Sequence, residues 1–436
     1  MKERYSISFL QPSKKIFRFT ILAVVSLISF CILFSFDIFG AIAPTLVAQL
    51  GVSRGTIGTF YTAYAVAAIL SVLLAGLASD RLGYVKAGLI FLSLAILGAG
   101  LISVFATIDL LLLGRFVFGL GAESILVVNM AIISKWFKGK EMAMAMGIYV
   151  SFGRIGTIFS FNTGELIADH FGDYRYVFII AFSLSLLALL FLLLYIFLEK
   201  QAEKTLGPYE RSPDNKITIK KITKFPYSFW LIALLCMLFY SAVFPFTALS
   251  TDFFVDKWNI ARVAQATGSF FHKVFNNFGH IFSTAGGITS IITCSSLIFA
   301  PLAGFFVDKS GKRATFMIVG PVLMITSFLL LGFTAVYPVL PMILLGSAFV
   351  ILPAALWPSI PRVIDEKYTG SAYGLTFAIQ NIGVGLFPLL NGWLRDRTQT
   401  YQASMIMFAF LGLASLMLAL MLKQFDRKHG QILERP

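Results

Sequence analysis

Long apolar runs recur along the whole chain, and most charged residues lie in the short stretches between them. A helix that crosses a bilayer needs about 20 consecutive, mostly apolar residues. Runs of this length occur twelve times, which predicts an all-α membrane protein with twelve transmembrane helices. The predicted spans are residues 17–46, 55–79, 87–107, 109–134, 142–166, 175–198, 227–251, 284–306, 314–335, 339–362, 370–394 and 401–422.

The composition supports lipid as the solvent of these helices. Of the 436 residues, 58% are hydrophobic and only 13% are charged, whereas a soluble domain carries about 25% charged residues. The run that begins at Phe17 is longer than the hydrophobic region of a cleaved signal peptide, so we expect it to remain as a span.

Lys and Arg are distributed unevenly between the two sides of the predicted membrane protein. An even number of spans places both termini on one side, and that side holds 26 of the 35 Lys and Arg, against 7 in the opposite loops. Positive residues favour the cytoplasmic side, so we predict that both termini are cytoplasmic. The same bias accounts for the net charge of +14, and no nucleic-acid partner is expected.

A short motif of glycine, aspartate and a basic residue occurs twice. Its copies are Gly76, Asp80, Arg81 and Gly83 after the second span, and Gly304, Asp308, Lys309 and Gly311 after the eighth. A tight reversal of the chain needs glycine, and the charged residues can stabilise neighbouring helix ends. One copy would be a generic turn, but two copies offset by 228 residues indicate parallel six-helix repeats. We predict a gating or structural role for these residues.

The repeat defines the expected domains. We predict an N-terminal six-helix half over residues 1–198, a polar cytoplasmic linker over 199–226, a C-terminal half over 227–422 and a cytoplasmic tail over 423–436. The longer connection at residues 254–283 mixes aromatic residues with Asn, His and Lys, so an interfacial helix is predicted there.

The two glycine-aspartate loops and the Arg115-to-Gly121 segment resemble the signature of the major facilitator superfamily. The resemblance implies two six-helix halves that alternate in access. More specific blocks resemble the lysosomal dipeptide uniporter branch, and they occupy residues 114–124, 136–141, 154–156, 242–246, 355–358 and 372–383. This resemblance implies transport of dipeptides, with an acidic residue of the fourth span and an arginine of the fifth in the peptide site. The matching residues are Glu123 and Arg154.

Charged residues inside predicted spans are the strongest candidates for function, because each costs about 2.5–3.5 kcal/mol at mid-bilayer. Glu123 and Arg154 offer an anion for the amine of a zwitterionic peptide and a bidentate donor for its carboxylate. The alternative is that the two pair with each other and lock adjacent helices. Arg115 has a tethering or a gating role, and Asp37 a structural or gating role, with a proton site or substrate contact as the other possibility for Asp37.

Aromatic and amide side chains in the spans are the remaining candidates for the substrate site. Tyr and Trp combine an apolar body with one hydrogen-bonding group, which suits variable peptide side chains. Adjacent amides are costly in lipid unless they are buried. The alternative for the aromatic residues is packing or anchoring at the interface. The candidates are Tyr64, Tyr149, Tyr240, Trp357, Gln380 and Asn381.

We therefore predict a uniporter of small solutes, with dipeptides as the first candidate, acting in the lipid bilayer. The alternatives are a proton-coupled transporter of another organic solute or drug, and a non-transporting receptor on the same scaffold. The sequence has no P-loop, nucleophile elbow or metal-ligand cluster, so neither an enzyme nor a cofactor or metal is expected. The bacterial inner membrane is favoured over the lysosomal membrane, because no acidic dileucine sorting signal precedes the first span. Whether the transporter has an accessory subunit is left open by the sequence.

Overall fold

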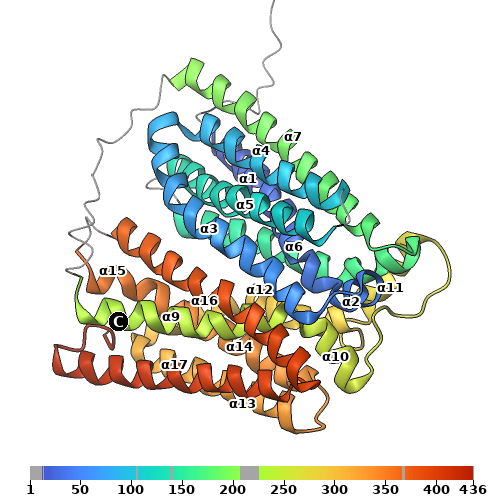
Figure 1. Ribbon diagram of the computed structural model, residues 1–436. Coiled ribbons are helices and arrows are strands. Elements are labelled where there is room, and N and C mark those ends of the chain that lie inside the picture. The colour runs from blue at the N-terminus through green and yellow to red at the C-terminus, as the bar shows by residue number, and fades with distance from the viewer. Residues whose placement is uncertain are drawn as a thin grey trace, which may run out of the picture. The chain divides into compact units, whose positions relative to one another are not determined.

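The computed structural model describes residues 12, 14–104, 107–137, 141–206, 225–365 and 369–435. The regular elements in these ranges are helices, apart from one isolated bridge between Ala261 and Thr284. Twelve of the helices are long and apolar enough to cross a membrane. The predicted all-α membrane protein with twelve spans is confirmed (Figure 1).

The helices follow one another with short connections. The first six spans are α1 (Lys15–Ala41), α3 (Arg54–Leu82), α4 (Tyr84–Val104), α5 (Ile108–Phe137), α6 (Met142–Phe171) and α7 (Arg175–Leu206), with the short α2 (Ala43–Leu50) after α1. The other six are α9 (Tyr227–Thr247), α12 (Ala285–Ser310), α13 (Arg313–Phe333), α14 (Val339–Leu356), α16 (Thr369–Thr398) and α17 (Gln402–Lys428). Short elements are α10 (Ser250–Trp258), α11 (Phe270–Gly279), the 3₁₀ turn η2 (Trp357–Ser359) and α15 (Ile360–Val363).

Two predicted boundaries were wrong for an identifiable reason. The first apolar run was predicted as one helix to residue 46, but α1 ends at Ala41 and α2 begins at Ala43. Pro44 lies in the first turn of α2, where the missing N–H of proline is tolerated. The seventh span was predicted to reach residue 251, but α9 ends at Thr247, two residues after Pro245.

The two repeated loops share a backbone feature. Gly83 has a φ of +86° and Gly311 a φ of +70°, values that L side chains avoid and glycine adopts freely. Gly311 ends α12, and its N–H donates to the carbonyl of Val307. The glycine that closes each copy of the motif is therefore required by the conformation of the turn.

The helices form two compact units. Unit 1 consists of Met1–Phe36, Leu70–Thr157 and Phe178–Asn215. Its tightest packing joins α4 and α5 through small residues, because a Cβ built on Gly98 would lie 2.2 Å from the backbone nitrogen of Phe118. A Cβ on Gly121 would lie 2.3 Å from the backbone nitrogen of Ala95. Small residues let membrane helices approach closely, and they fix these two helices side by side.

Unit 2 consists of Asp37–Ile69, Ile158–Val177 and Lys216–Pro436. It therefore joins the last six spans to the end of α1, the beginning of α3 and the end of α6. The end of unit 2 at which α9 finishes and α17 begins is its distal end. Backbones meet there without intervening side chains: a Cβ on Gly286 of α12 would lie 1.8 Å from the carbonyl oxygen of Phe161 of α6.

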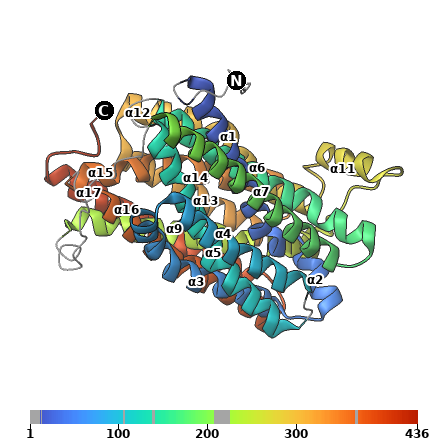
Figure 2. The same cartoon turned by 90° about the horizontal axis from the view of Figure 1, so that it is seen from above.

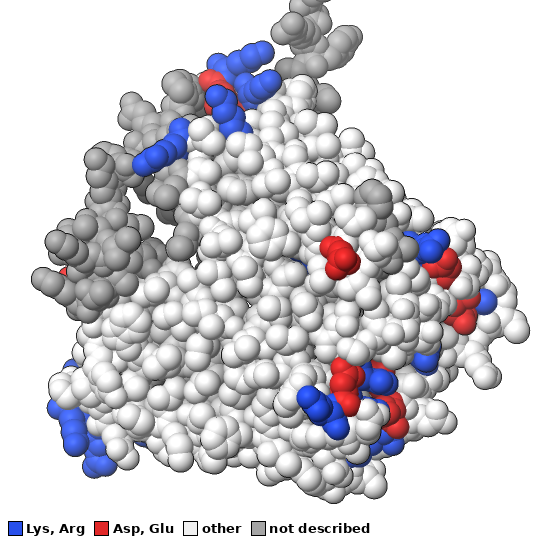
Figure 3. Space-filling model, in the orientation of Figure 1, with Lys and Arg blue, Asp and Glu red and all other residues white. Residues whose placement is uncertain are grey.

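The connection between α9 and α12 contains the helices α10 and α11. Helix α11, labelled in Figure 2, falls within residues 254–283, where a helix was predicted, and its place at the membrane interface stays a prediction. The side-chain amide of Asn277 donates to the carbonyl of Asn162 on α6 at 2.7 Å and accepts from the N–H of Ala264 at 2.9 Å. Phe271 and Phe275 of α11 are about three-quarters exposed. On the face drawn in Figure 3, charged side chains gather in a few clusters and most of the surface carries none.

Candidate functional site

Unit 1 holds the charged part of the predicted substrate site. Glu123 lies on α5 and Tyr149 on α6, and the two side chains interact electrostatically. The Tyr149 hydroxyl donates to the carbonyl of Leu126 at 3.2 Å, and its ring is buried. Ser29 and Asn129 are further hydrogen-bonding neighbours of that hydroxyl. The hydrogen bond from Tyr149 to Leu126 joins α6 to α5, the helix that carries Glu123.

Arg154 also lies in unit 1, on α6, five residues after Tyr149. Its side chain and that of Glu123 are both partly buried. Five residues make almost one and a half helical turns, so Arg154 and Tyr149 project from different levels of α6. The assignment of Glu123 and Arg154 to a substrate site remains a prediction.

The other predicted substrate residues lie in unit 2. The indole N–H of Trp357 donates to the hydroxyl of Tyr240 at 3.3 Å, and the Trp357 ring stacks on Phe377 at 4.6 Å. On α16, Gln380 accepts from the thiol of Cys236 at 3.4 Å, and Asn381 donates to the carbonyl of Phe377 at 3.0 Å.

Tyr64 of α3 belongs to unit 2 as well and is 2% exposed. The hydroxyl of Thr62, two residues before it, donates to the carbonyl of Gly385 on α16 at 2.6 Å. The beginning of α3 is therefore held directly against α16. The predicted aromatic and amide residues of unit 2 come from α3, α9, α16 and the η2 turn.

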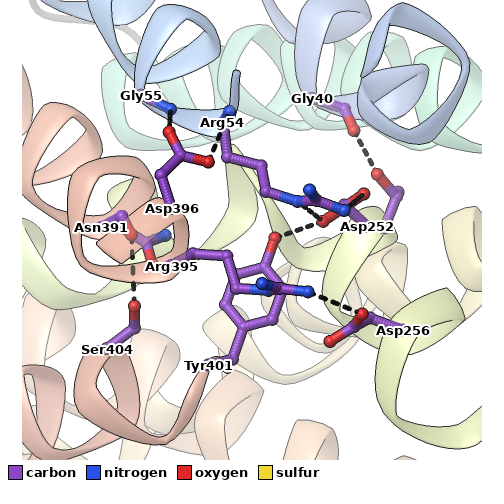
Figure 4. A network of polar contacts seen from close by, with 11 residues as sticks. Gly40, Arg54, Gly55, Asp252, Asp256, Asn391, Arg395, Asp396, Tyr401 and Ser404 are labelled. Carbon is purple, nitrogen blue, oxygen red and sulfur yellow. Dashed lines mark hydrogen bonds and ion pairs between the residues drawn. The ribbon is translucent and has the colours of Figure 1, made fainter. Parts of the chain in front are cut away.

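A polar network at the distal end of unit 2 was not predicted (Figure 4). At its centre, the guanidinium of Arg54 binds Asp252 through Nε at 2.7 Å and Nη2 at 3.2 Å. The Tyr401 hydroxyl donates to the same carboxylate at 2.5 Å. Asp396 accepts from the backbone N–H of Arg54 at 3.1 Å and from that of Gly55 at 2.7 Å.

This distal network joins helices that are far apart in the sequence. Arg54 begins α3, Asp252 belongs to α10, Asp396 lies in the last turn of α16 and Tyr401 precedes α17. A second ion pair lies alongside, where Arg395 donates to Asp256 at 2.9 Å. Only 6% of the Asp252 side chain and 24% of the Arg54 side chain are exposed. Such shielded, bidentate pairs are stronger than pairs on an open surface.

The electrostatics of Tyr401 reinforce the network. Burial, together with the adjacent Asp252 carboxylate, raises the pKa of Tyr401 well above its usual value of 10. Ionisation of the phenol would place two negative charges at hydrogen-bonding distance in a dry environment. Tyr401 therefore keeps its proton and remains a hydrogen-bond donor to Asp252.

The predicted gating residues occupy several places. Arg115 is fully buried on α5, and its Nη1 donates to the carbonyl of Phe36 on α1 at 3.2 Å. Its guanidinium also lies 5.4 Å from the Phe36 ring centroid. These contacts join two helices of unit 1, as the tethering alternative requires. Asp37, in unit 2, is 7% exposed.

The gating residues of the repeated motif lie near the ends of α3 and α12. Asp308 accepts from Arg313 at 3.0 Å, and Lys309 lies 5.8 Å from the Phe305 ring centroid. A Cβ placed on Gly304 would have no neighbour within 4 Å, and Arg81 is exposed. Gly76 and Asp80 belong to α3, but the surroundings of both residues fall outside what the structure describes.

Metal binding finds no support in the part of the chain that the structure describes, since no group of three His, Cys, Asp or Glu there could hold an ion. The three cysteines are free thiols. The chemistry available is binding by ion pairs, hydrogen bonds and aromatic contacts.

Comparisons with known proteins agree with this architecture. Lysosomal dipeptide transporter MFSD1 of Danio rerio is 27% identical over 401 residues, which cover 88% of this chain and 82% of that protein. Its namesake from Gallus gallus is 30% identical over 318 residues, covering 71% of this chain and 67% of that protein. The crystal structure of nucleoside transporter NupG shares the fold, with a TM-score of 0.69, 18% identity, and coverage of 94% of this chain and 99% of that one.

The profile of the Major Facilitator Superfamily matches residues 25–271 and 263–435, nearly the whole chain. The fold is accordingly the major facilitator fold, with twelve transmembrane helices in two six-helix halves. The chain belongs to the Major Facilitator Superfamily and is a multi-pass membrane transporter of small solutes rather than an enzyme.

Proposed function

We propose that this transporter is a uniporter of dipeptides that works by alternating access. Relatives that carry the name dipeptide transporter match most of the chain, and this likeness supports the choice of substrate. The two halves, residues 1–198 and 227–422, rock around a central site while the linker at 199–226 keeps them joined.

The substrate site is centred on Glu123 and Arg154. The carboxylate of Glu123 binds the ammonium group of the peptide, and the planar guanidinium of Arg154 binds its carboxylate through two hydrogen bonds. The observation that carries this proposal is that an anion and a cation, Glu123 on α5 and Arg154 on α6, are both partly buried within spans of unit 1, where a charged side chain is costly and usually functional. Tyr64, Tyr240, Trp357, Gln380 and Asn381 supply contacts to the peptide backbone and side chains.

Neutralising either charge is expected to weaken transport by about 10- to 100-fold, because a hydrogen bond to a charged group contributes about 1.5–3 kcal/mol. A thermal-shift screen of dipeptides, amino acids, sugars and organic anions first identifies a ligand that stabilises the folded protein. Counterflow of that ligand is then measured in proteoliposomes for Glu123→Gln and Arg154→Gln.

Exposed residues of the same type provide matched controls. Glu203→Gln and Arg175→Gln remove one charge each from exposed positions and are expected to transport like the native protein. Full dipeptide flux in both site variants would eliminate the proposed site, and a screen in which no dipeptide stabilises the protein would eliminate the proposed substrate.

The orientation proposed is cytoplasmic for both termini, in a bacterial inner membrane. The distal end of unit 2 then faces the extracytoplasmic side, and the distal network closes that side of the transporter. The glycine-aspartate loops lie on the cytoplasmic side and stabilise the opposite closure. Accessibility of a cysteine placed after Lys428 to an impermeant maleimide in intact cells tests the orientation, since labelling from outside would reverse it.

A second candidate function is proton-coupled transport of another organic solute. Two buried carboxyl groups support this second candidate, since only 7% of Asp37 and 4% of Glu165 are exposed. Uphill solute flux driven by an imposed pH gradient would establish coupling, whereas flux that follows only the solute gradient establishes uniport.

A further inference from the structure

Glu165 is a buried acidic residue for which neither the substrate site nor the distal network has a role. It lies on α6, one and a half turns before the helix ends, and 4% of it is exposed. Its Oε2 accepts a hydrogen bond from the Thr45 hydroxyl at 2.6 Å, and its Oε1 accepts from the Thr45 backbone N–H at 3.4 Å. Thr45 lies in the first turn of α2.

A cation is linked to this carboxyl group through a third residue. The Arg262 guanidinium donates to the Thr45 hydroxyl oxygen at 3.4 Å and interacts electrostatically with Glu165. Arg262, Thr45 and Glu165 thus form a hydrogen-bonded chain. Because Thr45 lies between the two charges, the attraction is weaker than in a direct, bidentate ion pair.

The Thr45 hydroxyl can serve both protonation states of Glu165. A hydroxyl carries one donor and two acceptor positions, and a protonated carboxyl carries one donor beside its acceptors. The ionised carboxylate accepts from Thr45, as the structure has it. The neutral acid keeps the N–H contact and exchanges the hydroxyl bond for one that it donates. Neither state leaves the buried group without a partner, which is the requirement for reversible proton binding.

Other charged groups around Glu165 are few. Asp169, one turn further along α6, is exposed and interacts with Glu165 as a like charge. Neither α2 nor the beginning of α12 contributes a charged residue. The remaining ionisable groups on these packed elements are His170 in the last turn of α6, whose ring packs on Phe270 of α11, together with Asp37 on α1 and His272 and Lys273 on α11. Among these groups, Arg262 is the cation that is linked to Glu165 through Thr45 and that interacts with its charge.

We infer that Glu165 is a proton-binding site and that its protonation loosens the contact between α2, α6 and the segment after α10. The ionised carboxylate accepts the hydrogen bond of Thr45 and attracts Arg262, which holds the segment after α10 against α2 and α6. A proton removes that charge and leaves Arg262 with only a neutral hydroxyl acceptor. Acid on the distal side then favours separation of the first-half helix ends from the segment after α10.

The first part of the experiment detects the proton directly. Infrared difference spectra of the purified protein in nanodiscs are recorded between about pH 8 and about pH 5.5, a range in which exposed carboxyls stay mostly ionised. The expected result is a C=O stretching band of a buried carboxylic acid that appears on acidification and is missing in Glu165→Gln. Asp169→Asn is the matched control and keeps the band. A band that persists in Glu165→Gln, or no band in the native protein, would overturn the proposal.

The second part measures the loosening. Spin labels at Ala48→Cys and Thr267→Cys, with the native cysteines replaced, report the distance between α2 and the segment after α10. Acidification is expected to lengthen this distance in the native protein, and Glu165→Gln is expected to show the long distance at both pH values. Arg262→Gln, which leaves the carboxyl in place, should lose the pH response as well. A distance that does not change with pH in the native protein would refute the coupling.

Neither readout requires a substrate. The proton site can therefore fail while the proposed dipeptide function stands, and the reverse holds too.

Discussion

Replacing Arg54 by Gln is expected to increase the population of molecules whose distal end is open by a factor of about 100 to 4,000. Removing one partner of a buried ion pair costs about 3–5 kcal/mol, because the remaining charge is left uncompensated, and each 1.4 kcal/mol is a factor of ten. In the closed arrangement, the Tyr401 hydroxyl is then the one donor to Asp252 among the residues that the structure describes. In an open arrangement water can solvate the carboxylate, so the loss falls on the closed state.

The measurement is labelling of Ser250→Cys by an impermeant maleimide in proteoliposomes. Ser250 begins α10 and is fully buried in the closed distal end. Arg397→Gln is the control, since Arg397 lies at the same end of α16 but is exposed. Unchanged labelling in Arg54→Gln would contradict a closing role for the network. Comparison of Arg54→Gln, Asp252→Asn and the double variant isolates the pair, for which we expect a coupling of about 0.5–3 kcal/mol.

Adding a single methyl group at Gly286 is expected to destabilise the fold by about 1–3 kcal/mol or more. The added Cβ would lie 1.8 Å from the carbonyl oxygen of Phe161. That neighbour is a backbone atom in the middle of α6, so it cannot rotate away as a side chain could. The distal end of α6 must then move off α12, which breaks the hydrogen bond between Asn162 and Ser290 at 3.0 Å.

Gly304→Ala on the same helix is the matched control for Gly286→Ala. No atom lies within 4 Å of a Cβ at Gly304, and alanine in a helix is favoured over glycine by about 0.5–1 kcal/mol. Thermal unfolding in detergent should therefore give a lower midpoint for Gly286→Ala and an equal or higher one for Gly304→Ala. Equal midpoints for the two variants would show that the backbone contact contributes nothing to stability.

The helices were predictable because hydrophobic length is a local property of the chain. Each span needs its own apolar run, so twelve runs gave twelve helices in the right order. The break between α1 and α2 was not predicted, because Pro44 reads equally well as a bend within a helix and as the first turn of a new one.

The charged network at the distal end could not be predicted for the opposite reason. Arg54 and Asp252 are 198 residues apart, and each lies where a charge at the end of a span is ordinary. Glu165 was overlooked similarly, because the fifth span was predicted to end at residue 166, whereas α6 continues to Phe171 and buries the side chain. Glu123, Arg154 and Arg115 stood out because each interrupts an apolar run and lies in a segment that resembles a family motif.

The contact of Asp396 with α3 has a consequence for how related sequences should vary. Asp396 accepts from the backbone N–H groups of Arg54 and Gly55, whereas Asp252 binds the side chain of Arg54. Any residue except proline supplies a backbone N–H, so position 396 can keep its carboxylate whatever stands at position 54. At position 252 the carboxylate binds the side chain of residue 54, so a change at either position removes the contact unless the other changes too. In an alignment of relatives we expect pairwise covariation between 54 and 252, and none between 54 and 396.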